Sequence, residues 1–295
     1  MSAKLKIAWV GLGRMGVPMA KNLLPLAAPL KVFNRSAERA APLAAAGAVV
    51  ASSARDAAKD SDIVFTMVAD DKALEAVTTG PDGILAVMQA GSILVDMSTV
   101  SPALSLRLAE AAAARKIGYL CAPVSGSVAM AESAKLTLLV SGAAADIARC
   151  GPCFSRLTAK QYVVGPGNQA RTLKLALNLM IGASAAMLGE ALTLAEKSGI
   201  DWNILLEVVA NSAIASPFVQ YKVGQLKTRD FTPMFMAHQM AKDFGLISDA
   251  AAAEGVSLPV AAKVGDYWQE MMKRGLGELD FIACLRVVEQ DAGLG

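Results

Sequence analysis

The chain is 295 residues long, 54 % hydrophobic and 18 % charged, with a formal net charge of +2. This length favours two domains, and this composition supplies a large core and excludes extended disorder. Because the charge is small and scattered, we expect no nucleic-acid partner. Lys4 and Lys6 interrupt the N-terminal apolar run. The longest apolar segment, at residues 173–188, contains Lys174 and Asn178. We therefore expect no signal peptide, no membrane span and a cytoplasmic location.

An apolar run at residues 5–10 predicts a buried strand, and a glycine-rich motif follows it directly. The motif has the pattern GxGxxG and consists of Gly11, Leu12, Gly13, Arg14, Met15 and Gly16. Between a strand and a helix, this pattern is typical of a dinucleotide-binding turn. The first glycine permits the turn, the second lets the backbone approach a pyrophosphate, and the third lets the helix pack closely. The start of the helix then offers N–H groups to the phosphates.

The second predicted strand, residues 30–33, ends at Asn34, Arg35 and Ser36. A dinucleotide fold that prefers NAD places an acidic residue here, which binds the ribose hydroxyls. That acid is absent, and Arg35 offers a planar fork of donors to a 2′-phosphate. We therefore expect NADP (NADPH) as the cofactor, with NAD bound at lower preference.

Helices and short strands alternate as far as residue 164. Further strands are predicted at residues 49–50, 62–68, 92–95, 118–120, 136–140 and 161–164. Repeated βα units predict a doubly wound, largely parallel Rossmann-type sheet, in which ligands lie at the carboxyl ends of the strands. Gly11, Val68 with Met67 before it, Thr99 and Ser125 all fall at such ends.

From residue 165 onward the pattern is helical. A Gly-Pro-Gly turn at residues 165–167 precedes Asn168, which can cap a helix that runs to a basic last turn and a glycine at residues 197–199. Further helices are predicted at residues 202–211, 217–226, 235–254, 259–271 and 279–290. We therefore predict an NADP-binding Rossmann domain at residues 1–164 and an all-helical domain at residues 165–295. The long helix at residues 165–198 joins the two.

The long helix is apolar on nearly every side between residues 173 and 188, which predicts burial on nearly every side. Lys174 and Asn178 lie four residues apart and therefore on one face. Desolvation favours a neutral amine and would bring the pKa of Lys174 towards a value useful for proton transfer near neutrality. The alternative is that Lys174 extends to a surface, and the residues alone leave both interpretations open.

Cys150 and Cys153 spell a dithiol motif of the thioredoxin type. They fall inside an amphipathic helix predicted at residues 144–157, late in the βα series, so we interpret them as a chance pair in a reducing compartment. His238 is the only histidine of the chain. A zinc site would need more Cys or His ligands, so we expect no metal.

The chain resembles the β-hydroxyacid dehydrogenase family, the relatives of 3-hydroxyisobutyrate dehydrogenase, over almost its whole length. The similar stretches are the glycine motif with Met-Ala-Lys-Asn-Leu at residues 19–23, Asp-Met-Ser-Thr at 96–99, Ala-Pro-Val-Ser-Gly at 122–126, residues 167–178, and Lys-Asp at 242–243. The resemblance implies an NAD(P)-dependent oxidoreductase, acting on CH–OH groups, that assembles as a homodimer or homotetramer.

The resemblance also implies roles for individual residues. Lys174 is the implied proton donor, and Asn178 is its substrate-orienting partner. Thr99 is implied near the nicotinamide ribose and Lys242 at the cofactor. The implied substrate-binding residues, which hold or surround a carboxylate, are Ser125, Gly126, Ser127, Phe235 and Asp243. With the proton assigned to Lys174, we interpret His238 as structural.

Within the family, the second half looks most similar to glyoxylate and succinic semialdehyde reductases, through Ser127 and residues 197–201 and 275–281. Cys121 and Ser216 depart from the family pattern and bear on the substrate rather than on the reaction. The implied activity is NADPH-dependent interconversion of a small carboxylate-bearing aldehyde, glyoxylate or succinic semialdehyde, and its hydroxy acid. Alternatives are a 3-hydroxyisobutyrate dehydrogenase, a non-catalytic dehydrogenase-like binding module and an imine reductase. The presence of Lys174 and Asn178 argues against the last two.

Overall fold

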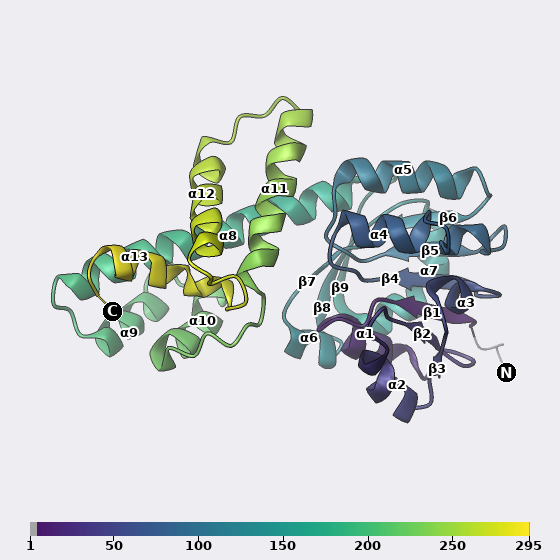
Figure 1. Ribbon diagram of the computed structural model, residues 1–295, viewed down its shortest axis with the longest axis horizontal. Helices are drawn as coiled ribbons and strands as arrows, with labels where there is room; N and C mark the ends of the chain where they lie inside the picture. Colours follow the sequence, from purple (N-terminus) through teal and green to yellow (C-terminus); the bar gives the residue numbers. More distant parts are fainter. Residues whose placement is uncertain (1–4, 295) are drawn as a thin grey trace. The chain divides into compact units, whose positions relative to one another are not determined.

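The computed structural model describes residues 5–294 (Figure 1). Residues 1–4 and 295 lie outside the described residues. They include Lys4 and the outer ends of the two predicted domains. The chain divides into two compact units, Met1–Lys174 (unit 1) and Leu175–Gly295 (unit 2). The division falls inside helix α8 (Gln169–Lys197), whereas the sequence analysis placed the domain boundary before this helix.

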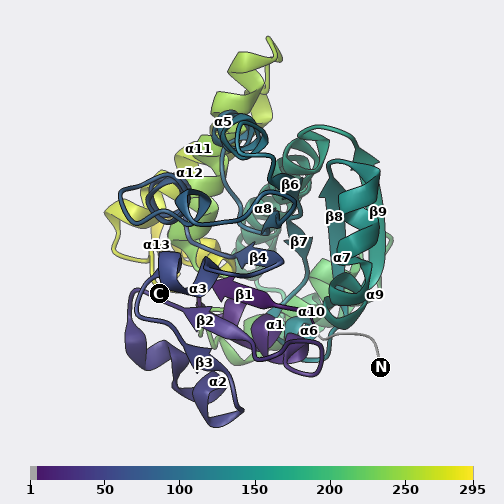
Figure 2. The same cartoon turned by 90° about the vertical axis from the view of Figure 1, so that its right-hand side faces the viewer.

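Unit 1 is built on one sheet. Its strands are β1 (Ile7–Val10), β2 (Lys31–Phe33), β3 (Val49–Val50), β4 (Ile63–Thr66), β5 (Ile93–Asp96), β6 (Gly118–Cys121), β7 (Val124–Ser125), β8 (Leu136–Ser141) and β9 (Thr158–Gly165). Within residues 5–294 they follow the order β3-β2-β1-β4-β5-β6-β8-β7, with β9 paired to β8. In Figure 2, β8, β9 and α7 (Ala144–Leu157) lie at one edge, and β2 and β3 at the other.

The predicted doubly wound parallel sheet is confirmed for the strands from β3 to β6, which all pair in parallel. β8 instead runs antiparallel to β6 and β7. The sequence analysis did not predict β7, because a two-residue strand carries no measurable alternation of apolar and polar residues.

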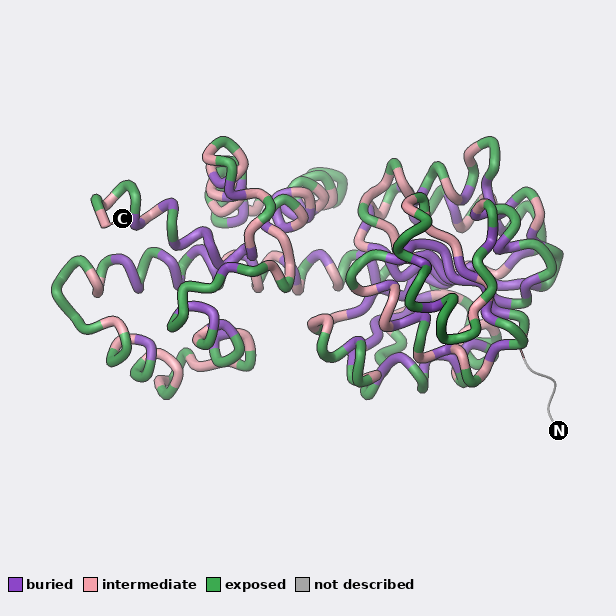
Figure 3. Tube along the Cα trace, turned by 60° about the horizontal axis from the view of Figure 1, so that its bottom comes forward, coloured by how far each residue is buried: buried purple, intermediate pink, exposed green. Residues whose placement is uncertain are grey.

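The remaining helices of unit 1 are short, apart from α5. They are α1 (Gly16–Leu23), the 3₁₀ helix η1 (Ala37–Ala40), α2 (Ala41–Ala45), α3 (Ala54–Ala58), α4 (Asp71–Thr78), the 3₁₀ helix η2 (Ile84–Ala86), α5 (Pro102–Ala113) and α6 (Val128–Glu132). Successive side chains of β1 point to opposite faces: Ile7 and Trp9 pack with α1 and α7, and Ala8 and Val10 pack with α3 and α5. Helices therefore bury both faces of the central strands β1, β4 and β5, in which every residue is buried (Figure 3). The edge strand β3 and most of β9 are exposed.

The regular secondary structure in the described residues of unit 2 is helical, apart from an isolated bridge between Met236 and Asp280. After α8 come α9 (Trp202–Asn211), α10 (Pro217–Thr228), α11 (Ala237–Ala253), α12 (Pro259–Lys273), the 3₁₀ helix η3 (Phe281–Cys284) and α13 (Leu285–Asp291). Prolines open α10 and α12. Close packing of α8 and α11 requires Gly182, because a Cβ there would lie 2.3 Å from the ring of Phe244.

The prediction that α8 is buried on nearly every side is wrong. Leu173, Met180, Met187 and Leu194 are 36, 54, 68 and 72 % exposed and recur every seventh residue along one stripe. Apolar composition does not reveal which faces of a helix have neighbours in the fold. By length and composition alone α8 could also cross a membrane, but the core helix of a soluble protein meets the same criterion, so this is weak evidence.

Two local predictions also need correction. Asn168 precedes α8 but its side chain does not cap it: Nδ2 donates to the carbonyl of Pro102 at 2.9 Å, and Oδ1 has no hydrogen-bond partner among the described residues. The helix predicted at residues 279–290 is two pieces, η3 and α13. In the first case a tertiary contact outcompetes the local capping bond that the sequence favours.

Candidate active site

The glycine motif forms a tight turn between β1 and α1. Gly11 has a φ of +101°, and its N–H donates to the carbonyl of Phe33 at 2.9 Å. A Cβ on Gly11 would lie 2.2 Å from the carbonyl oxygen of Met67, and a Cβ on Gly16 would lie 2.0 Å from that of Gly11. A Cβ on Gly13 would have no neighbour within 4 Å. Packing therefore requires the first and third glycines, and the second borders open space that a pyrophosphate can enter.

The start of α1 supports the same ligand. The residue before it, Met15, makes no side-chain capping bond. Pro18 has no N–H, and the N–H of Val17 donates to the carbonyl of Gly13 at 3.2 Å. The N–H of Gly16 is therefore the donor that the first turn of the helix can offer to an anion.

A pocket of ≈ 330 Å³ is lined by Leu12, Gly13 and Arg14 of the motif, and by Arg39 of η1 among others. Glu38 and Glu132 also line this pocket. Its two arginines and the backbone of the glycine turn are the groups that fit the phosphates of a dinucleotide.

Asn34 ties the end of β2 to the glycine turn. Its Oδ1 accepts a hydrogen bond from the N–H of Leu12 at 2.8 Å, and its Nδ2 donates to the carbonyl of Ser36 at 3.0 Å. The side chain of Arg35 between them is exposed. The hydrogen bonds of Asn34 therefore hold the glycine turn in place, and the exposed side chain of Arg35 can contact a ligand.

The loops after β4 and β5 lie next to each other, because Thr66 pairs with Asp96 in the parallel register. Met67 and Val68 follow β4, and the N–H of Val68 donates to Oγ of Ser98 at 2.9 Å. Thr99, the next residue after Ser98, is half-buried. Unit 1 therefore gathers these predicted cofactor residues at the strand ends that also carry the glycine turn.

The predicted carboxylate loop begins in β7, where Ser125 pairs with Thr137 of β8. Gly126 has a φ of +139°, a backbone conformation that residues other than glycine rarely adopt. The hydroxyl of Ser127 accepts from the N–H of Met130 at 3.4 Å and caps α6. The loop is a sharp turn with half-buried hydroxyl groups on both sides of a glycine.

The predicted catalytic residues lie on α8 and α11. Nδ2 of Asn178 donates to Oδ2 of Asp243 at 2.6 Å, and Nζ of Lys242 lies 2.9 Å from Oδ1 of the same carboxylate. Asn178 and Asp243 are buried, and the side chain of Lys242 is 27 % exposed. Lys174 is half-buried and lies one helical turn before Asn178 on α8. Unit 2 therefore joins three of the predicted residues in one polar cluster.

The two other predicted residues flank the start of α11. Phe235 is half-buried and contacts Phe281 edge to face, with 5.9 Å between ring centroids. Nδ1 of His238 lies 3.2 Å from the carbonyl oxygen of Gly277 and 3.3 Å from a carboxylate oxygen of Glu278. These contacts link α11 to the turn before η3, which supports a structural interpretation of His238.

The sequence analysis missed a buried charged pair at the start of α8. Nη2 of Arg171 donates to Oδ2 of Asp96 at 2.5 Å, and both side chains are inaccessible to solvent. An arginine in an apolar helix, three residues before Lys174, is a signal that could have revealed it.

The cysteines are buried thiols among the described residues. Burial raises the pKa of Cys150 and Cys153 to about 12, and for Cys150 the neighbouring Cys153 adds to the effect. Burial likewise raises the pKa of Cys121, at the end of β6, to about 11. Such thiols stay protonated near neutrality and are poor nucleophiles. Within residues 5–294 no group of three potential ligands could hold a metal ion.

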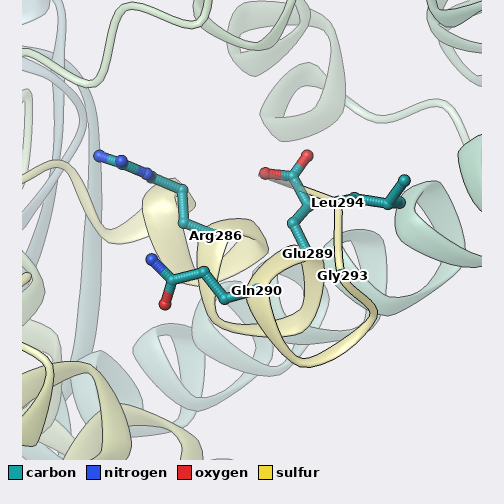
Figure 4. Close-up of a pocket in the computed structure, with 5 residues that line it drawn as sticks. All are labelled: Arg286, Glu289, Gln290, Gly293 and Leu294. Carbon is teal, nitrogen blue, oxygen red and sulfur yellow. The ribbon is translucent and has the colours of Figure 1, made fainter.

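Another pocket, of ≈ 420 Å³, lies at the C-terminal helix (Figure 4). Arg286, Glu289, Gln290, Gly293 and Leu294 line it, and none of the predicted site residues does. The carboxylate of Glu289 is paired with Arg229 at 2.6 Å. This pocket is therefore separate from the candidate active site.

Comparison with known proteins shows which proteins the chain resembles. A family model described as the NAD binding domain of 6-phosphogluconate dehydrogenase matches residues 6–165. One described as NAD-binding of NADP-dependent 3-hydroxyisobutyrate dehydrogenase matches residues 168–288. The 2-(hydroxymethyl)glutarate dehydrogenase of Eubacterium barkeri is 34 % identical, over 100 % of this chain and 98 % of that protein. The NAD-dependent L-serine dehydrogenase of Pseudomonas aeruginosa is 31 % identical, over 98 % of this chain and 99 % of that protein.

A solved structure shows the same architecture. The 3-hydroxyisobutyrate dehydrogenase of Salmonella typhimurium superposes with a TM-score of 0.87 and 28 % identity, over 96 % of this chain and 100 % of that one. The two family models together match residues 6–165 and 168–288, which include most of both units. On these grounds the chain belongs to the β-hydroxyacid dehydrogenases, the NAD(P)-dependent oxidoreductases related to 3-hydroxyisobutyrate dehydrogenase.

Proposed function

We propose that the protein interconverts a small carboxylate-bearing aldehyde, glyoxylate or succinic semialdehyde, and the corresponding hydroxy acid, with NADP(H) as the preferred cofactor. One observation carries the proposal: Lys174 lies one helical turn before Asn178, whose amide is held by the buried carboxylate of Asp243. In a chain of this family, a lysine and a fixed amide supply the proton donor and the substrate-orienting group that the reaction needs.

The residues of the chain have distinct tasks in this mechanism. The nicotinamide, when bound, supplies the hydride for reduction or accepts it in oxidation. Lys174 protonates the developing alkoxide and, in the reverse direction, takes the hydroxyl proton. Its ammonium group also stabilises the oxyanion electrostatically. Asn178 holds the reacting oxygen, and Ser125 with the N–H groups of the adjoining turn holds the carboxylate.

The proposed preference for NADP rests on the end of β2, where no acidic residue is present and Arg35 is exposed. Arg14 and Arg39 line the pocket beside the glycine turn, together with Glu38 and Glu132. Two guanidinium groups favour a 2′-phosphate over a free hydroxyl. We propose that NAD binds less tightly.

A 3-hydroxy acid is the second candidate substrate class. The three compared proteins are named for 2-(hydroxymethyl)glutarate, L-serine and 3-hydroxyisobutyrate. All three compounds carry a carboxylate two carbons from the hydroxylated carbon. The chemistry of proton and hydride transfer is the same in both candidates, and only the space around the carboxylate differs.

We further propose a homodimer or homotetramer in the cytoplasm, without a nucleic-acid or membrane partner. Support for self-association comes from Leu173, Met180, Met187 and Leu194, because large apolar side chains exposed along one stripe of a helix favour an interaction surface. Light scattering of the wild type and Met187→Glu tests this: the variant should have a lower mass, and equal masses would contradict this surface.

The substrate proposal is tested with a matched panel. NADPH oxidation is measured with glyoxylate, succinic semialdehyde, methylmalonate semialdehyde and butyraldehyde, and NADP reduction with 3-hydroxyisobutyrate, 4-hydroxybutyrate and serine. A neutral aldehyde leaves carboxylate donors unpaired, which costs roughly 1–3 kcal/mol, or about tenfold to a hundredfold in kcat/KM. Butyraldehyde as good as the best acid would contradict the carboxylate site. Strong 3-hydroxyisobutyrate oxidation without glyoxylate reduction would favour the second candidate.

A further inference from the structure

Arg171, in the first turn of α8, has its guanidinium hydrogen-bonded on three sides inside unit 1. Nε donates to Oγ of Ser105 on α5 at 3.0 Å, and Nη2 donates to Oδ2 of Asp96 at 2.5 Å. Nη1 donates to the carbonyl oxygen of Ser98. The side chain is 0 % exposed. A single residue therefore fastens α8 to α5, to the end of β5 and to the loop after β5.

The acceptor side of this cluster extends to the neighbouring strand. Oδ1 of Asp96 accepts from Oγ1 of Thr66 at 2.8 Å and from Oγ of Ser98 at 2.7 Å. Oγ of Ser98 in turn accepts from the N–H of Val68 at 2.9 Å. The cluster thus fixes both loops that carry predicted cofactor residues, the one after β4 and the one after β5.

Stability alone is a weak explanation for this cluster. Removing two charges from water is costly, and apolar side chains of similar volume often replace a buried ion pair without loss of stability. Arginine does offer geometry: its planar fork of donors reaches several acceptors at once in fixed directions, whereas a lysine ammonium acts as a point charge. The contacts made by Arg171 are directional and hold three different segments.

Lys174 lies three residues after Arg171 and therefore on a neighbouring position of the same helix face. Thr99 directly follows Ser98, whose carbonyl accepts from Arg171. We propose that Arg171 is a positioning residue, which sets the place of Lys174 against the loop at residues 97–99 and so against the nicotinamide end of the cofactor. This inference rests on the proposed function.

The test compares Arg171→Lys and Arg171→Met with wild type and with a matched control, Arg107→Lys. Arg107 makes an exposed ion pair with Glu75 on the surface of unit 1, at 3.2 Å. Three quantities are measured: the melting temperature, kcat and KM with the best carboxylate-bearing aldehyde, and the Kd values for NADPH and for 2′-phospho-ADP-ribose, which lacks the nicotinamide.

Arg171→Lys should fold and should lose kcat by about tenfold to a hundredfold with little change in KM, because misplacement by about 1 Å can cost about a hundredfold. Its affinity for NADPH should fall while its affinity for the fragment stays at the wild-type value, since only the nicotinamide end meets the displaced loop. Arg107→Lys should match wild type in every measurement. Arg171→Met should show the same pattern as Arg171→Lys where it folds.

Wild-type kcat and an unchanged ratio of the two Kd values in Arg171→Lys would overturn the proposal. Failure of Arg171→Lys to fold would overturn it as well, because the pair would then serve the folding of unit 1. The ratio of Kd values needs no substrate, so it also decides the case in which wild type is inactive on every acid tested. An inactive wild type counts against the proposed function, and an unmoved ratio counts against the positioning role.

Discussion

Nδ2 of Asn178 donates a hydrogen bond of 2.6 Å to Oδ2 of Asp243, so two buried side chains link α8 to α11. Lys242 lies 2.9 Å from the other oxygen of that carboxylate. Because one amide hydrogen of Asn178 is committed to Asp243, the orientation of the amide is fixed.

This link predicts a specific pH dependence for Asn178→Asp. The variant would place two carboxyl groups at hydrogen-bonding distance, and two carboxylates so close cannot both ionise without a large cost. A proton shared between them is retained at low pH and lost as the pH rises. The melting temperature of Asn178→Asp should therefore fall between about pH 5 and pH 8 relative to wild type.

Asn203→Asp is the matched control, because Asn203 is an exposed asparagine on α9 of the same unit. Its melting temperature should follow the wild-type pH profile. Parallel profiles for Asn178→Asp and wild type would show that the two side chains do not meet as described.

Arg35→Ala should reduce the preference for NADPH. A bidentate charge-assisted contact with a phosphate contributes on the order of 1.5–3 kcal/mol, so the ratio of kcat/KM for NADPH over NADH should fall about tenfold or more. Arg39→Ala is measured beside it, since Arg39 lines the pocket at the glycine turn. Arg55→Ala, at an exposed position on α3, serves as the control. An unchanged ratio in Arg35→Ala with a reduced one in Arg39→Ala would move the phosphate site to Arg39.

The buried thiols of α7 should affect stability at alkaline pH and not activity. Burial raises the pKa of Cys150 and Cys153 from 9.0 to about 12. Below pH 9 both thiols are protonated in the folded and unfolded states, so their ionisation does not reduce the free energy of unfolding. As the pH rises from 9 towards 12, only the unfolded chain ionises, so the free energy of unfolding falls.

The double variant Cys150→Ala, Cys153→Ala should therefore keep wild-type turnover and lose less stability than wild type between about pH 8 and pH 10. Chemical denaturation at both pH values measures this. Loss of turnover in the double variant, or control of wild-type activity by a dithiol, would restore the redox interpretation.

The sequence predicts best those features whose interacting residues lie close together in the chain or on adjacent strands. The steric demands on Gly11 and Gly16 come from neighbouring backbone atoms, so the spacing of the glycines predicts the turn. The carboxylate of Asp201 caps α9 by accepting from the N–H groups of Asn203 and Ile204, and Pro217 opens α10, as their positions predict. In each case the partner lies within a few residues or in an adjacent strand.

Long-range pairings are not readable in this way. Arg171 meets Asp96 across 75 residues, and Asn178 meets Asp243 across 65 residues. The exposed stripe of α8 could not be predicted for the same reason, because the composition of a helix does not show which of its faces other elements cover. Asn168 combines both effects: its position is correct, but its side chain binds a carbonyl 66 residues away.

The central claim is that Lys174 transfers the proton. The most direct test is single-turnover reduction of the best carboxylate-bearing aldehyde by Lys174→Ala saturated with NADPH, with Lys197→Ala at the exposed end of α8 as the control. Lys174→Ala should bind NADPH as wild type does and react ~10²–10⁴-fold more slowly, the usual contribution of general acid catalysis. The control should react at the wild-type rate. A folded Lys174→Ala that binds NADPH and keeps more than about a tenth of the wild-type rate would contradict the claim.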